Sequence, residues 1–146
     1  MKQKVFIAGG TGYMGSRLIP LLVARGHEVK ALVRPGSERK LPPGAACVSG
    51  DPLQMDSYTA QVSGCDAFVH LIGVPHPSPA KAAQFRAVDA VSIRVAGQAA
   101  QAAGIRHFIY LSVAHSAPMM QAYIKVRSEG EALIRSLKLP ATFLRP

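Results

Sequence analysis

Three glycines close to the amino terminus have the spacing of a turn that can hold a phosphate group. Gly9, Gly12 and Gly15 directly follow an apolar run and precede a stretch with helical periodicity. The first glycine permits a tight turn, the second lets a pyrophosphate approach the backbone, and the third lets helix and strand pack closely. Backbone N–H groups at the start of the helix, helped by the helix dipole, would face the phosphates. The pattern predicts a dinucleotide-binding turn; a glycine turn without a ligand is the alternative.

The end of the second apolar run carries the residue that would choose between NAD and NADP. Asp or Glu at this position accepts hydrogen bonds from the ribose of NAD, whereas Arg suits the 2′-phosphate of NADP. Arg34 stands here, and the nearest acidic residue, Glu38, lies in the following loop. Ser37, Arg39 and Lys40 could add donors. NADP is therefore the predicted cofactor, with NAD as the second choice; a solvated loop charge at Arg34 is the alternative.

The elements that must position these residues follow from the alternation of short apolar runs with helical stretches, which is typical of βαβ units and a parallel sheet. The expected strands span about 5–8, 29–33, 46–48, 67–72, 107–113 and 141–144. The longer expected helices are one that ends before Gly26 and two that span about 82–103 and 122–137. The predicted fold class is an α/β fold, a Rossmann-type doubly wound parallel sheet of about six strands in three layers, α/β/α. Ligands of such sheets bind where the loops at the carboxyl ends of the strands surround a crevice.

Composition narrows the class of protein. The length of 146 residues and the hydrophobic content of 49% fit one folded domain over residues 1–146. The net charge of +9 favours anionic partners, but its Lys and Arg are spread along the chain, so nucleic acid is not an expected partner. No apolar run has the length of a membrane span, and no leader is evident, so a cytoplasmic location is expected. Cys47 and Cys65 are predicted to be ordinary thiols, and no metal site is expected.

Several motifs together resemble the extended and atypical short-chain dehydrogenase/reductase superfamily, in its NAD(P)-binding epimerase/dehydratase-like and NmrA-like branches. They are Gly9-Gly10-Thr11-Gly12-Tyr13-Met14-Gly15, Val33-Arg34, Gly50-Asp51, Tyr123 through Glu131, and Leu144-Arg145-Pro146. The resemblance covers essentially the whole chain. It implies that the turn from Gly9 to Gly15, with Thr11, Tyr13 and Met14, binds the cofactor, that Asp51 contacts the adenine amino group, and that Leu71-Ile72-Gly73 lines the ribose. A local turn bond is the alternative role of Asp51.

The resemblance also implies a catalytic group. Members of the superfamily use a Tyr-x-x-x-Lys pair and a Ser or Thr after the fifth strand, and the matching residues here are Tyr123, Arg127 and Ser112. The tyrosine exchanges a proton with the reacting oxygen, and the lysine lowers the tyrosine pKa and holds the ribose. Arg127 departs from this pattern, because a guanidinium is not a simple substitute for an ammonium. The alternative is that Tyr123 packs in the helix without acid–base work. His70 and His115 are expected to be packing or surface residues.

Relatives continue past the Leu-Arg-Pro motif, so a carboxyl-terminal substrate-binding region is expected to be absent. The leading hypothesis is the NAD(P)-binding domain of an atypical short-chain dehydrogenase/reductase-like protein of the NADP-preferring reductase, epimerase or dehydratase lineage. The alternative is a non-catalytic, NmrA-like dinucleotide sensor of redox state, or an assembly subunit. The substrate is unknown, and catalysis by the isolated chain is left open. A homodimer through the helices at 82–103 and 122–137 is one expected assembly.

Overall fold

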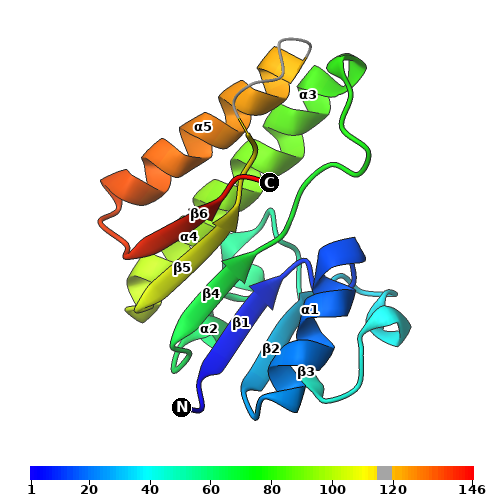
Figure 1. Cartoon of the computed structure of the whole chain (residues 1–146), viewed down its shortest axis with the longest axis vertical. Coiled ribbons are helices and arrows are strands. Elements are labelled where there is room, and N and C mark those ends of the chain that lie inside the picture. Colours follow the sequence, from blue (N-terminus) through cyan, green and yellow to red (C-terminus); the bar gives the residue numbers. More distant parts are fainter. Residues whose placement is uncertain (115–119) are drawn as a thin grey trace.

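The computed structural model describes residues 1–114 and 120–146, and its strands form a six-stranded sheet (Figure 1). The strand order is β3-β2-β1-β4-β5-β6, and every neighbouring pair is parallel. The strands are β1 (Lys4–Ala8), β2 (Glu28–Val33), β3 (Ala45–Ser49), β4 (Ala67–His70), β5 (His107–Leu111) and β6 (Ala141–Leu144). The helices are α1 (Tyr13–Ala24), α2 (Thr59–Val62), α3 (Ala82–Gln84), α4 (Val91–Ala103) and α5 (Gln121–Ser136). This is the predicted Rossmann-type sheet, whose order reverses between β1 and β4.

One helix differs from the sequence-based expectation in a way that bears on the site. The expected helix at 82–103 is preceded by a 3₁₀ turn, Pro79–Lys81, and it contains a π-helical segment, Phe85–Ala90, between α3 and α4. Such segments insert one extra residue into a helix and change which side chains face inward. Helix α1 ends as expected, since Gly26 follows its last turn with a left-handed φ of +84°.

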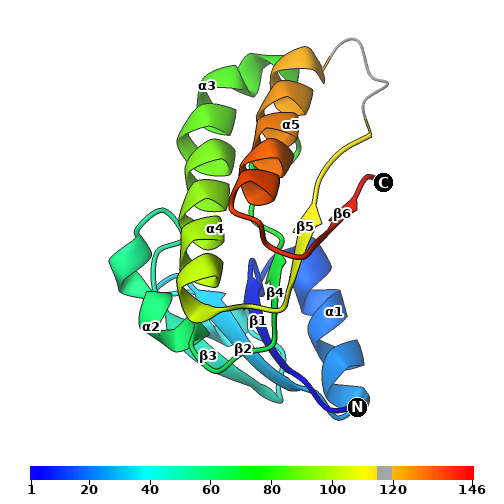
Figure 2. The ribbon, with the colours of Figure 1, turned by 90° about the vertical axis from the view of Figure 1, so that its left-hand side faces the viewer.

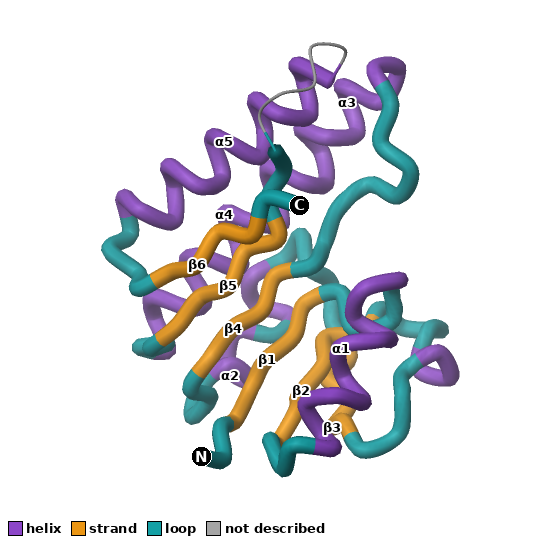
Figure 3. Tube along the Cα trace, viewed as in Figure 1, coloured by secondary structure: helices purple, strands orange, loops and turns teal. Residues whose placement is uncertain are grey.

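Strands β4 and β5 are shorter than predicted. The expected strands at 67–72 and 107–113 end at His70 and at Leu111. Leu71 and Ile72 continue the apolar pattern of β4 and pack against the core from the loop that follows it. Figure 3 shows that the chain leaves β1 and β4 at the same edge of the sheet, and that the loop after β4 runs from there to α3.

The sheet separates two apolar cores (Figure 2). On the face covered by α2, α4 and α5, Phe6, Phe68 and Phe108 stand in register on β1, β4 and β5, with adjacent ring centroids 5.1 Å apart. On the other face, Ile7 and Ile19 pack together under α1. Because β1 and β4 are covered on both sides, they consist of nearly continuous apolar residues.

The face that carries α1 is only partly covered. The connection between β2 and β3 holds a 3₁₀ turn, Glu38–Lys40, in place of a longer helix. A groove of about 390 Å³ lies beside α1 over β1, β4, β5 and β6, and its lining is mainly apolar: Gln3, Val5, Met14, Leu18, Leu22, His27, Ala67, Val69, Leu71, His107, Ile109, Leu111 and Leu144. In the part of the chain that the structure describes, no helix has the length and hydropathy to cross a membrane.

Candidate cofactor-binding site

The glycine turn after β1 has the geometry that its spacing predicts. Gly9 has a φ of +97°, and a Cβ there would come within 2.9 Å of the Leu71 carbonyl carbon. A Cβ on Gly15 would overlap the carbonyl oxygen of Gly9. At Gly12, by contrast, the nearest atom to an added Cβ lies 3.5 Å away. Gly9 and Gly15 are thus required by the fold, whereas the bare backbone of Gly12 leaves space that a ligand can use.

The start of α1 offers backbone donors to this space. Gly12 is the N-cap residue of α1, and the helix has neither a side-chain cap nor an acidic residue in its first turn. The first N–H groups of a helix lack acceptors within the helix, and the helix dipole makes this end partly positive. A helix start without an acidic side chain to neutralise it suits an anion such as a pyrophosphate.

A cleft of about 380 Å³ opens above this turn. Loops that follow β1, β2, β3 and β4 line it, together with the segment that enters α4. Its lining residues are Gly9, Thr11, Gly12, Leu32, Arg34, Asp51, Pro52, Leu53, Leu71, Ile72, Gly73, Val74, Pro75, Gln84 and Val88. Eight of the predicted cofactor residues are among them: Gly9, Thr11, Gly12, Arg34, Asp51, Leu71, Ile72 and Gly73. Tyr13, Met14, Gly15 and Ser37 were also predicted but are not among the lining residues.

Arg34 and Asp51 are the charged residues of this lining. Arg34 is exposed and follows β2 directly. The acidic residue nearest to it in sequence, Glu38, is turned toward its own loop, where its carboxylate accepts hydrogen bonds from the Gly36 N–H at 2.9 and 3.1 Å. Hydrogen bonds from the backbone at Glu38 itself and from Gly36 hold the pKa of this carboxyl below its ordinary value. Glu38 is therefore engaged elsewhere and leaves Arg34 unpaired with it.

Asp51 has the local role that was its alternative interpretation, and it still faces the cleft. Its Oδ1 accepts a hydrogen bond from the Leu53 N–H at 2.9 Å, and its own N–H donates to Ser57 Oγ at 2.8 Å. These bonds fix the turn after β3. Because Asp51 also lines the cleft, the turn presents a carboxylate to any ligand there.

The three predicted catalytic residues are only partly brought together. The Arg127 guanidinium lies 5.2 Å from the centroid of the half-buried Tyr123 ring, which packs on Phe85 with ring centroids 5.0 Å apart. Ser112 is buried, and its hydroxyl donates to Glu131 Oε2 at 2.5 Å. None of the three lines the cleft as the described residues form it. Lys125 is exposed on the far side of α5, 3.9 Å from Glu129.

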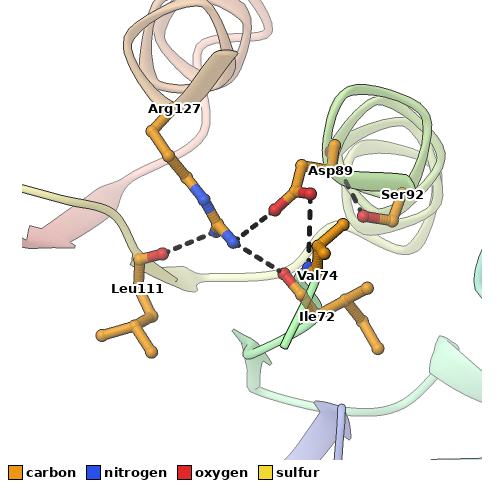
Figure 4. A network of polar contacts seen from close by, with 6 residues as sticks. All are labelled: Ile72, Val74, Asp89, Ser92, Leu111 and Arg127. Atoms are coloured by element: carbon orange, nitrogen blue, oxygen red, sulfur yellow. Dashed lines mark hydrogen bonds and ion pairs between the residues drawn. The ribbon is translucent and has the colours of Figure 1, made fainter. Parts of the chain in front are cut away.

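Arg127 belongs to a buried polar network with Asp89 and the backbone of the loop that follows β4 (Figure 4). Its Nη2 lies 2.6 Å from Asp89 Oδ1, and its Nη1 donates to the Leu111 carbonyl at 2.8 Å. Burial raises the pKa of Asp89, and the adjacent Arg127 charge opposes that shift. The sequence analysis did not single out Asp89. Its position, four residues from both Phe85 and Ile93, was a usable indication of a buried carboxylate. Charged residues are seldom fully buried without a partner, so such a carboxylate implies a buried ion pair.

The two histidines fall on different parts of the chain. His70 ends β4 and is fully buried, as a packing residue should be. Burial, followed by the nearby Arg127 charge, lowers its pKa to about 3. Neither ring nitrogen has a hydrogen-bond partner among the described residues. His115 lies outside the described residues.

Comparison with known proteins identifies the family. A family model described as NAD(P)H-binding matches residues 9–146. The chain belongs to this family. It is an NAD(P)-binding Rossmann domain of the short-chain dehydrogenase/reductase and epimerase-like superfamily, as the glycine turn and the later motifs predicted.

Individual relatives of this NAD(P)H-binding domain include reductases. It is 28% identical to a ceramide reductase of Caulobacter vibrioides, over 97% of this chain and 45% of the relative. It is 32% identical to a 3-diazoavenalumate denitrifying reductase of Streptomyces, over 79% of this chain and 39% of the relative. The Bordetella bronchiseptica enzyme WbmH, crystallised with NAD+, shares the fold with a TM-score of 0.81 and 22% identity, over 99% of this chain and 56% of that one. The chain thus spans less than half of both reductases.

Proposed function

We propose that the cleft binds NADP in preference to NAD, as the cofactor-binding part of a reductase. The observation that carries the proposal is Arg34, which lines the cleft at the end of β2 and is exposed to an incoming phosphate. The acidic residue nearest in sequence, Glu38, is bonded to its own loop. A guanidinium can pair with a phosphate through two parallel hydrogen bonds, so Arg34 favours a 2′-phosphate over a 2′-hydroxyl.

Replacement of Arg34 by Ala tests this preference. The intact chain should bind NADPH more tightly than NADH, and the variant should lose most of that difference, because one charge-assisted contact is gone. A loss of about 1.5–3 kcal/mol is expected, which is roughly ten- to a hundredfold in the Kd for NADPH. Titration calorimetry with both cofactors measures it.

Arg25→Ala is the matched control. Arg25 is exposed and follows the last turn of α1, at the opposite end of the helix from the glycine turn, so its removal makes the same charge change away from the cleft. Both affinities should stay within a factor of about two, because distant exposed charges are screened by salt. Equal Kd values for NADPH and NADH in the intact chain would refute the preference.

We further propose that Tyr123 serves as the proton donor in this reductase. Its half-buried ring lies beside the Arg127 guanidinium and packs on Phe85. Phe85 lies in the chain between Gln84 and Val88, two residues that line the cleft. The full-length protein should then oxidise NADPH with a carbonyl or quinone substrate. Tyr123→Phe should lower kcat by about a hundredfold or more while NADPH binding persists, because general acid catalysis contributes that much to the rate.

A dinucleotide sensor without catalysis is the second candidate. Two predicted catalytic residues are engaged within the protein, which favours the sensor: the Ser112 hydroxyl donates a hydrogen bond to Glu131, and the Arg127 guanidinium forms an ion pair with Asp89. A sensor should bind oxidised and reduced cofactor with different affinities and turn over neither. Turnover by the full-length protein that Tyr123→Phe abolishes excludes the sensor, whereas binding of both redox forms with different affinities and no turnover by the full-length protein favours the sensor.

A further inference from the structure

The Arg127–Asp89 ion pair is the most deeply buried charged contact that the structure describes. The two side chains are 5% and 0% exposed, and their closest atoms are 2.6 Å apart. Charges at this depth need both a counter-ion and further hydrogen bonds, and removal of one partner alone leaves the other buried without compensation. Arg127 has such further bonds to the carbonyl oxygens of Leu111 and Ile72, at 2.8 and 3.2 Å.

These contacts hold the loop that follows β4 from two sides. Arg127 Nη2 donates to the Ile72 carbonyl, and the Val74 N–H donates to Asp89 Oδ2 at 3.3 Å (Figure 4). Gly73, between these two residues, has no side chain in the way: a Cβ there would overlap Arg127 Nη2 and lie 3.0 Å from Asp89 Oδ1. The glycine therefore lets the ion pair reach the backbone of the loop.

The same loop forms a wall of the cofactor cleft. Residues 71–75 all line the cleft, and the facing segment adds Gln84 and Val88, of which Val88 immediately precedes Asp89 in the chain. The π-helical segment Phe85–Ala90 contains Asp89, and its carboxylate is buried beneath the loop. π-helical turns commonly occur at functional sites, where the extra residue re-aims a side chain.

We infer that Arg127 and Asp89 form a clamp that positions the loop at 71–75 for cofactor binding. Both are positioning residues that act through the backbone of Ile72 and Val74. The clamp joins α5, the π-helical segment and the ends of β4 and β5, so its loss frees the loop without removing any atom from the lining of the cleft. This inference rests on cofactor binding in the cleft and is independent of the NADP preference.

A double variant separates positioning from folding. In Asp89→Leu/Arg127→Met both buried charges are gone together, so the chain should fold, whereas either single change leaves an unpaired charge in the interior. The double variant should keep a cooperative unfolding transition but bind NADPH and NADH each at least about tenfold more weakly, because small misplacement of a binding wall is costly. Arg34→Ala should weaken NADPH binding alone, so failures of the two proposals are distinguishable.

Arg127→Lys and a surface pair complete the design. The lysine keeps the charge opposite Asp89 but lacks the fork that reaches Leu111 and Ile72 at once, so its cofactor affinities should fall between those of the wild type and the double variant. Lys125→Ala/Glu129→Ala removes an exposed ion pair of the same helix and should leave both affinities unchanged. A folded double variant with wild-type affinity for both cofactors overturns the inference.

Amide hydrogen exchange of the wild-type chain gives a second test that needs no variant. The Val74 N–H should exchange slowly without cofactor, since its acceptor is the buried Asp89 carboxylate. Exchange as fast as that of the Gly36 N–H, whose acceptor is the exposed Glu38, would also overturn the clamp. This result stands even if the double variant fails to fold.

Discussion

At the scale of single residues, burial decides what each predicted site residue can do. Arg34 is exposed and lines the cleft, so its charge is available to a ligand. Arg127 has the same functional group but is enclosed, and the protein itself supplies its partners. The Ser112 hydroxyl likewise donates its hydrogen bond within the protein, to Glu131. Side-chain type alone does not distinguish an arginine that binds a cofactor from one that holds a loop, because both need an anion or carbonyl nearby.

His70 links burial to a measurable pH dependence. Its pKa falls from an unfolded value near 6.5 to about 3 in the folded chain, so the folded state resists protonation. Its contribution to stability is complete above pH 6.5 and is lost as the pH falls toward 3. Between pH 7 and pH 4.5 the wild type should therefore lose about 2–3 kcal/mol that His70→Leu does not lose.

Urea denaturation of the wild type and of His70→Leu at both pH values measures this difference. Carboxylates also titrate in this range, but they are common to the two proteins and cancel in the comparison. Parallel stability curves for the two chains would show that folding does not lower the pKa of His70.

At the scale of elements, glycines of one motif have different structural roles in the turn from β1 into α1. Gly15 has no room for a side chain, because the Gly9 carbonyl occupies that position. Gly12 has room and an ordinary extended conformation, with φ −78° and ψ −176°. The same sequence motif therefore contains one glycine that the packing of α1 on β1 needs and one that only a ligand needs.

Two alanine substitutions should separate these roles. Gly15→Ala should destabilise the fold by about 3 kcal/mol, because the added Cβ overlaps backbone. Gly12→Ala should leave the melting temperature nearly unchanged yet weaken NADPH binding by about 1–3 kcal/mol, as its Cβ enters the phosphate space. Thermal unfolding and cofactor titration of both variants test the pair. Equal loss of stability in the two variants would contradict the assignment.

At the scale of the whole molecule, the two faces of the sheet are unequally covered. Helices α2, α4 and α5 cover one face of the sheet, and α1 covers part of the other (Figure 2). An apolar groove lies beside α1 over β4, β5 and β6. The expected homodimer through α4 and α5 stays a prediction. Arg94 and Gln98 of α4 are exposed, as is the Lys125–Glu129 pair of α5.

The amino-acid sequence by itself determined the sheet, the glycine turn and most of the cleft lining. These features depend on local patterns: apolar runs of strand length, a glycine spacing, and Arg34 at a strand end. Loops at the carboxyl ends of parallel strands meet at one edge of the sheet, so the sequence could place the loop after Gly50 at the crevice, whereas the roles of Asp51 and Leu71 were implied only by the family resemblance.

Only the tertiary structure decided which polar residues line the cleft and which are bonded within the protein. Asp89 and Arg127 are 38 residues apart in the chain and meet at 2.6 Å only after α5 packs beside the π-helical segment. The structure also decided where β4 and β5 end, since their pairing stops at His70 and Leu111, before the ends that the sequence predicted. Contacts between distant segments depend on packing and on the cost of burying charge, and neither leaves a periodic mark on the sequence.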